Sequence, residues 1–268
     1  MRRQSFALLC SLLAFALIGT ACDGGSSGGS VITTEDPGYI SGTAEAVLYY
    51  PTNISTAAPA TTMSAGYTQT LNNVEWLSET LAENGYVVLA FTPTNNWGYV
   101  SGWRNAHKNC ISKLKDINNN HSVLRGLINT SKLQTCGHSK GGGGSLWASS
   151  ELQGDLKTSI GMAPYREEFS DSTLGSITAA TFVQAGGSDT LATNSMTRGE
   201  YGGLGNISKM YVEYTGYDHL AWDGATGSTA DRISGDIMAW MGYYMDGDTT
   251  FASTLSNTSG TSRHEWVK

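Results

Sequence analysis

A pentapeptide of the Gly-x-Ser-x-Gly type, at residues 137–141, is the segment of this chain best suited to covalent chemistry. It reads Gly-His-Ser-Lys-Gly, follows a strand-like segment at 133–136 and precedes a Gly-rich segment at 142–150 that can open a helix. In a strand-turn-helix of this kind, the serine has a strained backbone and its hydroxyl projects above the sheet edge. The context predicts that Ser139 is a nucleophile, and the alternative is an ordinary Gly-rich turn.

A serine nucleophile needs a base, which in this arrangement is a histidine that comes later in the chain. Of the five histidines, His219 and His264 are the two that lie well after Ser139. His264 falls in a polar tail, 257–268, with little to fix its position, whereas His219 follows the strand-like segment 210–214. We therefore assign the base to His219, with a solvated loop histidine as the alternative.

The base in turn needs a carboxylate to orient it, placed at the end of another strand. Segment 179–185 is typical of a buried strand, and Asp189 follows it closely. Asp155, Asp171 and Asp218 compete for this role. Asp218 adjoins the base in the chain, where side chains diverge, and Asp171 has no strand before it. Asp189 is the predicted acid, and a turn-forming aspartate is the alternative.

Acyl transfer also needs backbone N–H groups that stabilise an oxyanion. The N–H of Lys140, directly after the predicted nucleophile, is the first candidate. The second comes from the loop 64–69, which follows a strand-like run at 60–63. There Gly66 allows the chain to turn, so that Tyr67 can present its N–H group. A loop aromatic that is merely packed is the alternative for Tyr67.

The elements that must position these groups alternate along the chain. Residues 86–91 form an unbroken apolar run, as expected for a strand covered on both faces. Apolar side chains recur at three- and four-residue steps in 103–117 and 237–244, which predicts helices with one buried face. The pattern predicts an α/β fold with a mostly parallel central sheet flanked by helices, and no lid domain.

The N-terminus has the composition of a targeting segment. Arg2 and Arg3 precede an apolar run at 6–18, which is short for a membrane span. We therefore expect a signal peptide over residues 1–21.

Cys22, which follows Gly-Thr-Ala, fits a bacterial lipoprotein cleavage site. One expectation is therefore acylation of Cys22 and attachment to a membrane, and the other is plain secretion after cleavage at Ala21. A flexible Gly/Ser linker is expected over 22–33, followed by one catalytic domain over 34–268.

The overall charge restricts the partners. The net charge is −7 and no basic cluster interrupts it, which argues against nucleic acid. The His and Cys spacing predicts no metal site, and the serine chemistry needs no cofactor. We expect a monomer.

The chain resembles the bacterial cutinases and polyester hydrolases (PETase-like) of the α/β-hydrolase superfamily, from about Ala44 to Phe251. The segments that carry the resemblance are Val47–Asn53, Ala65–Thr68, Asn84–Val88, Gly137–Ser139, Met162–Tyr165, Gly187–Asp189 and Asp218–His219. The resemblance implies the α/β-hydrolase fold and an open surface cleft.

The resemblance also implies substrate contacts. Tyr67 and Tyr165 would hold the acyl or aromatic part of an ester. His138 would pack beside the nucleophile, and Leu220 and Trp222 would border the cleft.

The sequence departs from this family at several positions. Lys140 stands where Met is usual, and Ala65 where Pro is usual. Because the Lys140 side chain should reach the cleft or its rim, we expect it to favour esters that carry a nearby negative charge. Cys110 and Cys136 lie on a helix and a strand whose relevant ends should share one edge of the sheet. This arrangement permits a disulfide, and two buried thiols are the alternative.

These features predict an extracytoplasmic serine carboxylester hydrolase that acts on polyesters, cutin-like or PET-like, and on short esters. A small-ester or acetyl-polysaccharide esterase is the first alternative, because the same triad serves all of them. A non-catalytic surface binding protein is an alternative of another class. The complete, ordered Ser-Asp-His set argues against it.

Overall fold

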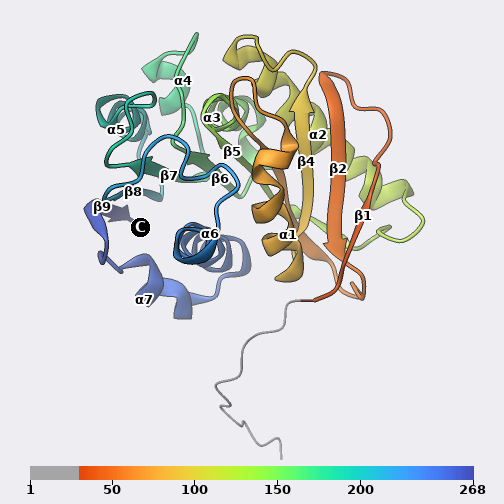
Figure 1. The fold of residues 1–268 in the computed structure, drawn as a ribbon. Helices are drawn as coiled ribbons and strands as arrows, with labels where there is room; N and C mark the ends of the chain where they lie inside the picture. The colour runs from red at the N-terminus through yellow and green to blue at the C-terminus, as the bar shows by residue number, and fades with distance from the viewer. Residues whose placement is uncertain (1–29) are drawn as a thin grey trace, which may run out of the picture.

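The computed structural model describes residues 30–268, which form a nine-stranded mixed sheet with helices on both faces (Figure 1). The strands are β1 (Ile32–Glu35), β2 (Thr43–Pro51), β3 (Ala58–Ser64), β4 (Val87–Pro93), β5 (Ile128–His138), β6 (Thr158–Met162), β7 (Ala180–Gly186), β8 (Lys209–Tyr214) and β9 (Thr261–Val267). Their order across the sheet is β1-β2-β4-β3-β5-β6-β7-β8-β9. The six strands β3 to β8 are parallel, whereas β1 and β2 at one edge and β9 at the other pair antiparallel.

The helices divide between the two faces of the sheet. They are α1 (Glu75–Glu83), α2 (Val100–Asn120), α3 (Lys140–Leu152), α4 (Asp171–Gly175), α5 (Asn194–Gly203), α6 (Gly227–Met241) and α7 (Ala252–Leu255). Short 3₁₀ or π segments are η1 (Leu71–Val74), η2 (Gln153–Asp155), η3 (Gly242–Asp246) and η4 (Thr249–Phe251). Side chains of α2 to α5 pack into one core, and those of α1, α6 and α7 pack into a second core on the other face of the sheet.

This architecture confirms the predicted α/β-hydrolase fold. The helices predicted at 103–117 and 237–244 are α2 and the end of α6 continued by η3. Between β6 and β7 stands only the five-residue α4, so residues 30–268 contain no lid domain.

Strand β4 shows why residues 86–91 are an unbroken apolar run. Val87, Leu89 and Phe91 point into the core beside α2 and α3. Val88 and Ala90 point into the core beside α1 and α6. Successive side chains of a strand alternate between faces, and here both faces are covered.

The same alternation overturns the predicted disulfide. Cys110 of α2 lies in the core on one side of the sheet, whereas Cys136 of β5 points into the core on the other side. Both are buried free thiols, and burial raises the pKa of each thiol far above its usual value. The prediction placed the ends of the two elements at one edge, but the Cys136 side chain points away from α2.

Both thiols should therefore be found reduced. If the protein is denatured and alkylated without a reductant, peptides that contain Cys110 and Cys136 should carry the label in full. Peptide mass spectrometry measures this directly. A peptide pair linked by a disulfide would contradict the opposed placement of the two side chains.

The two edges of the sheet also differ from expectation. Ile32 already pairs with Pro51, so the folded domain begins two residues before the expected boundary at 34. The tail 257–268 is not loose, because β9 pairs with β8 and holds His264 in register. A short edge strand that is covered on only one face has too few apolar residues for the two-residue alternation of a strand to be recognised in the sequence.

The remaining N-terminal expectations lie outside the described residues. These are the signal peptide, Cys22 and most of the linker. Within the described part of the chain, no helix is long and apolar enough to cross a membrane.

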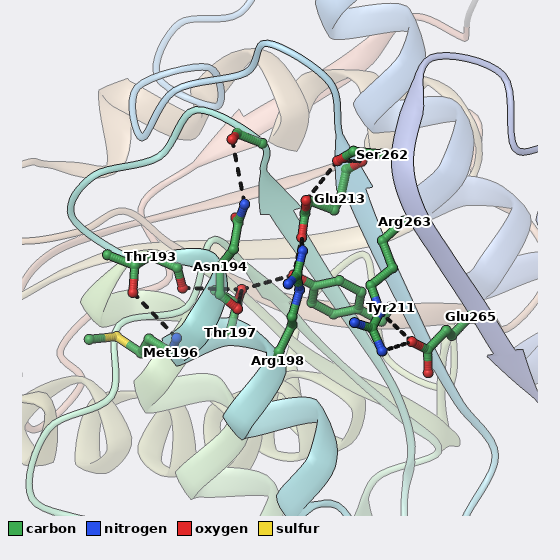
Figure 2. A network of polar contacts seen from close by, with 11 residues as sticks. Thr193, Asn194, Met196, Thr197, Arg198, Tyr211, Glu213, Ser262, Arg263 and Glu265 are labelled. Atoms are coloured by element: carbon green, nitrogen blue, oxygen red, sulfur yellow. Dashed lines mark hydrogen bonds and ion pairs between the residues drawn. The ribbon is translucent and has the colours of Figure 1, made fainter.

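Glu213, at the end of β8, ties α5 and β9 to the sheet (Figure 2). Arg198 of α5 donates to Glu213 Oε2, and Tyr211 donates to the same oxygen at 3.0 Å. Ser262 of β9 donates to Glu213 Oε1 at 2.7 Å. Burial alone would raise the pKa of Glu213, but these hydrogen bonds and the charge of Arg198 outweigh burial and lower it.

Helix α5 also buries a carboxyl group that has no partner. Glu200 is fully buried, and neither carboxyl oxygen is hydrogen-bonded to any residue between 30 and 268. Burial raises the pKa of Glu200 well above its usual value, with only partial opposition from the charge of Arg166. The folded protein therefore keeps this carboxyl neutral to a higher pH than the unfolded chain does.

Replacing Glu200 should change how stability depends on pH. The pKa of Glu200 is raised in the folded state. The stability that Glu200 contributes is therefore complete below about pH 4.3, the usual glutamate pKa, and is lost as the pH rises through the folded pKa. Glu200→Gln removes this loss, so its Tm should exceed that of the wild type increasingly as the pH rises from about 4.3 through the folded pKa, by about 3 °C or more. Glu83→Gln, which makes the same charge change at an exposed site, is the matched control. A Tm difference that is constant over this range would exclude the effect.

Candidate active site

Ser139 occupies a sharp turn between β5 and α3. Its backbone angles, φ 55° and ψ −122°, lie in a region that non-glycine residues rarely adopt. A Cβ on Gly137 would come within 2.5 Å of the Gly141 backbone, and one on Gly141 within 2.5 Å of the Ala65 carbonyl oxygen. Two glycines are therefore required for the turn to close. This is the geometry of a nucleophile elbow.

The three predicted side chains form one hydrogen-bonded series. Ser139 Oγ lies 2.8 Å from His219 Nε2, and His219 Nδ1 lies 2.7 Å from Asp189 Oδ2. The other carboxylate oxygen of Asp189 accepts the N–H groups of Leu191 and Ala192 at 2.8 and 2.9 Å. The carboxylate is thus fixed from two sides, with one oxygen directed at the imidazole.

The competing aspartates are engaged elsewhere. Asp171 pairs with Arg166, and Asp155 pairs with Lys115 at 2.7 Å. Asp218 accepts the N–H group of Leu220 at 3.0 Å within its own turn.

The loop between β3 and η1 lies directly against the nucleophile. A Cβ on Gly66 would come within 2.6 Å of Ser139 Cβ, so only glycine allows this approach. The Gly66 N–H is held by Gln69 Oε1 at 2.8 Å. No acceptor within residues 30–268 is hydrogen-bonded to the N–H of Tyr67 or of Lys140. Both predicted donors therefore have an N–H group that no other part of the described chain uses.

A buried histidine of α2, not predicted from the sequence, joins this loop to the elbow. His107 Nδ1 lies 2.7 Å from Thr62 Oγ1, and Nε2 lies 3.0 Å from Ser64 Oγ and 3.2 Å from the Gly141 carbonyl oxygen. Burial lowers the pKa of His107 to about 3, although the contact with Gly141 opposes the shift. Because the Gly141 carbonyl can only accept, the neutral ring carries its proton on Nε2. Its partners are distant in the chain, so no local pattern indicates this role.

The expectation for Trp222 is wrong, since this side chain does not border the cleft. Trp222 is fully buried and donates through Nε1 to Gln184 at 2.9 Å. His138 is also buried, and its ring stacks on Trp222 with centroids 5.8 Å apart. His138 lies beside the nucleophile as expected, but behind the cavity wall rather than in it.

His138 instead supports the base. Its Nε2 donates to the His219 carbonyl oxygen at 2.8 Å. Burial and the neighbouring His219 lower the pKa of His138 to about 3, so the ring is neutral and has this one N–H.

A cavity of about 710 Å³ opens over Ser139 and His219. Its other lining residues are Tyr67, Thr68, Gln69, Asn73, Lys140, Tyr165, Glu167, Leu191, Leu220 and Asp223. Tyr67, Lys140, Tyr165 and Leu220 line it as predicted.

Three polar residues that line the cavity, Gln69, Asn73 and Asp223, were not predicted as part of the site. Asp223 accepts from Gln69 at 3.0 Å and from Asn73 at 2.6 Å. It thereby fastens the loop after His219 to the loop that carries Tyr67. The only local signal for Asp223 is that it follows the base by four residues.

Lys140 reaches the rim of the cavity, but its charge is compensated. Its Nζ lies 2.9 Å from Glu167 Oε2 and donates to the Gly98 carbonyl oxygen at 2.8 Å. The same nitrogen lies 4.6 Å from the centre of the Tyr67 ring. An anionic substrate would have to compete with Glu167, so the expected preference for anionic esters loses its basis.

Removing the competing carboxylate should create that preference. Glu167→Gln should lower KM for an anionic terephthalate half-ester about threefold relative to a neutral terephthalate diester, since partly exposed ion pairs contribute up to about 1 kcal/mol. Raising the salt concentration should reduce the difference. Glu168→Gln serves as the neighbouring control. An equal change for both esters would contradict the pairing of Lys140 with Glu167.

No three His, Cys, Asp or Glu side chains between residues 30 and 268 are grouped as metal ligands would be. The expectation of no metal or cofactor stays a prediction.

Comparison with known proteins agrees with the fold. Residues 21–266 match the model of the PET hydrolase-like family. Cutinase 1 of Thermobifida cellulosilytica is 29% identical over 235 residues, which cover 86% of this chain and 85% of the relative. Cutinase est2 of Thermobifida alba is 31% identical over 211 residues, 78% of this chain and 66% of the relative. The bis(hydroxyethyl) terephthalate hydrolase of Streptomyces coelicolor is 25% identical over 219 residues, covering 81% and 67%.

The fold and these similarities define a carboxylester hydrolase of the α/β-hydrolase class. Within that class, the chain belongs to the PET hydrolase-like family.

Proposed function

We propose that this protein hydrolyses polyesters, with Ser139 as nucleophile, His219 as base and Asp189 as the orienting acid. The observation that carries the proposal is the unbroken hydrogen-bonded series from Asp189 to Ser139 Oγ, which ends at the floor of the 710 Å³ cavity. Nucleophile, base and orienting group at hydrogen-bond distances are what acyl transfer requires.

In the first half of the reaction, Ser139 Oγ attacks the ester carbonyl carbon and His219 Nε2 takes the hydroxyl proton. Asp189 remains ionised, holds the proton on Nδ1 and stabilises the imidazolium. The N–H groups of Tyr67 and Lys140 stabilise the oxyanion of the tetrahedral intermediate. As the intermediate collapses, His219 Nε2 protonates the leaving alkoxide and the acyl group stays on Ser139.

In the second half, a water molecule attacks the acyl-enzyme while His219 Nε2 takes its proton. Collapse of the second intermediate returns that proton to Ser139 Oγ and releases the carboxylic acid. The side chains and backbone groups named above suffice for these steps, so we expect no cofactor.

The shape of the site supports a polymeric substrate. Tyr67, Leu191 and Leu220 line the cavity, and they are 45%, 58% and 57% exposed. Side chains this exposed form a rim rather than a roof, so a chain longer than the cavity can continue past it. Tyr165 adds an aromatic wall for the acyl part. Relatives named as cutinases and as a bis(hydroxyethyl) terephthalate hydrolase favour the same substrate class.

Two assays test this proposal. A fluorophosphonate should label Ser139 in the native protein, and lack of labelling would favour the non-catalytic binding protein. Product release from aromatic polyester film should then be compared with hydrolysis of a nitrophenyl acetate and of an acetylated polysaccharide. Fast cleavage of the acetyl substrates with no product from film would favour the small-ester or acetyl-polysaccharide esterase.

We further propose that the enzyme acts outside the cytoplasm as a monomer. The apolar run 6–18 and Cys22 support export, with a lipid anchor or free secretion as the two forms. Incorporation of labelled fatty acid that is lost in Cys22→Ser would establish the anchor.

A further inference from the structure

Beside the cavity, a turn at residues 95–99 carries two exposed aromatic rings. Trp97 is 67% exposed and Tyr99 is 66% exposed, so two large rings face outward within three residues of each other. The Trp97 ring meets the ring of Tyr67 edge-on, with centroids 5.6 Å apart. We call residues 95–99 the aromatic turn. Its rings continue the cavity wall outward from Tyr67.

The aromatic turn is fixed to the loop that carries the predicted oxyanion donor. The Asn96 carbonyl oxygen accepts the N–H of Thr68 at 2.7 Å, and Asn96 Nδ2 donates to the Gln69 carbonyl oxygen at 2.9 Å. Lys140 Nζ donates to the Gly98 carbonyl oxygen at 2.8 Å. These contacts hold the turn in one position relative to Ser139. Rings held this way bind a partner with little loss of conformational entropy.

Several polar groups of the turn are already hydrogen-bonded within the fold. The Asn95 carbonyl and side-chain oxygens accept the N–H groups of Gly98 and Trp97, each at 3.1 Å. The polar groups of Asn96 and the Gly98 carbonyl are engaged as described above. The exposed side chains of the turn are the Trp97 and Tyr99 rings and Asn95. The two rings give an aromatic unit of a polymer faces on which it can stack.

On the far side of Tyr99 lies a second, smaller groove of about 290 Å³. It is lined by Pro93, Asn95, Tyr99 and Asn105, among others, and none of its lining side chains is charged. Ester carbonyl oxygens can accept hydrogen bonds from amide and hydroxyl groups without any charge. The path from Tyr67 over Trp97 and Tyr99 into this groove therefore suits an uncharged chain of rings and esters.

We infer that Trp97, Tyr99 and the adjoining groove bind an aromatic polyester segment beyond the bond that is cleaved. This inference rests on the proposed function, because it takes the polymer to enter the Ser139 cavity. It adds a binding region, outside that cavity, that is specific to polymers. Small esters fill the cavity and do not reach it.

Adsorption measured without turnover tests the inference. The Ser139→Ala protein and its Trp97→Ala/Tyr99→Ala derivative should be titrated against aromatic polyester particles. We expect about tenfold weaker adsorption for the derivative, since two stacked rings at about 0.7 kcal/mol each contribute about 1.4 kcal/mol, which is tenfold in affinity. Trp97→Phe/Tyr99→Phe keeps both rings and should adsorb like the parent. Val123→Ala, which removes an exposed apolar side chain from the loop before β5, should also adsorb like the parent.

The active enzymes supply the second readout. In the active enzyme, which keeps Ser139, the double substitution Trp97→Ala/Tyr99→Ala should lower the rate on polyester film about tenfold more than the rate on nitrophenyl acetate. Equal adsorption of parent and derivative would overturn the inference. Loss of adsorption to acetylated polysaccharide particles in place of polyester would also overturn it. A wild type that is labelled by fluorophosphonate yet releases nothing from film would refute the proposed function, and the adsorption result would still judge the binding region.

Discussion

Ser139→Ala and His219→Ala should each lower kcat on a soluble nitrophenyl ester by roughly 10³ to 10⁶ while the fold is retained. Among residues 30–268, Ser139 carries the only hydroxyl that is hydrogen-bonded to the His219 ring, at 2.8 Å, so we expect no neighbouring group to replace it. Stopped assays for kcat, together with the Tm of each variant, check this. Ser172→Ala, at an exposed position of α4, is the matched control and should be fully active.

The double variant Ser139→Ala/His219→Ala should be no slower than either single variant, because the two residues act as one unit. A Ser139→Ala protein that keeps more than a tenth of the activity would show that another group is the nucleophile.

Asp189→Asn should lower kcat by about 10⁴ with little change in the fold. The asparagine oxygen can still accept the N–H groups of Leu191 and Ala192. Its amide nitrogen, however, would donate to His219 Nδ1, so the ring proton would lie on Nε2. A protonated Nε2 cannot accept the proton of Ser139. The kcat of the variant over pH 6 to 9 measures the loss.

Asp171→Asn makes the same chemical change at a site that pairs with Arg166. We expect at least half of the wild-type kcat. If instead Asp171→Asn were inactive and Asp189→Asn active, the assignment of the acid would be wrong.

Much of the fold and the relative placement of Ser139, Asp189 and His219 could be predicted from the sequence. Each of these residues follows a segment that is typical of a strand, and the carboxyl ends of parallel strands lie at one edge of the sheet. Chain order left His219 and His264 as candidate bases, and the strand before His219 decided between them, as the strand before Asp189 favoured that acid. Local patterns were sufficient because each inference needed only the neighbouring residues.

The errors arose where the direction of a side chain mattered. Cys136 points into the core beside α1 and α6, whereas Thr135, one residue earlier, hydrogen-bonds to Ser145 of α3 on the opposite face. Leu220 and Trp222 are two residues apart in a turn, and hydrogen bonds from Trp222 to Gln184 and from Trp76 to the Trp222 carbonyl hold only Trp222 inward. Such contacts join residues about 40 and 150 positions apart, and no single-sequence pattern reports them.

His107 was missed for the same reason. Its three partners lie on β3 and at the start of α3, 34 to 45 residues away. A histidine on the buried side of a helix reads as a packed residue until those partners are known.

The neutral carboxyl of Glu200 has a consequence for an enzyme whose product is an acid. Every ester bond that is cleaved releases a carboxylic acid, so the water layer at a degrading polymer becomes more acidic. At pH values between about 4.3, the usual glutamate pKa, and the raised pKa of Glu200, acidification favours the folded protein over the unfolded chain through Glu200. The hydrogen bonds and ion pair of ionised Glu213 are lost only at a lower pH, because the pKa of Glu213 is lowered. Over this interval, the acid that the reaction releases removes the cost of ionising Glu200 while the hydrogen bonds of ionised Glu213 persist.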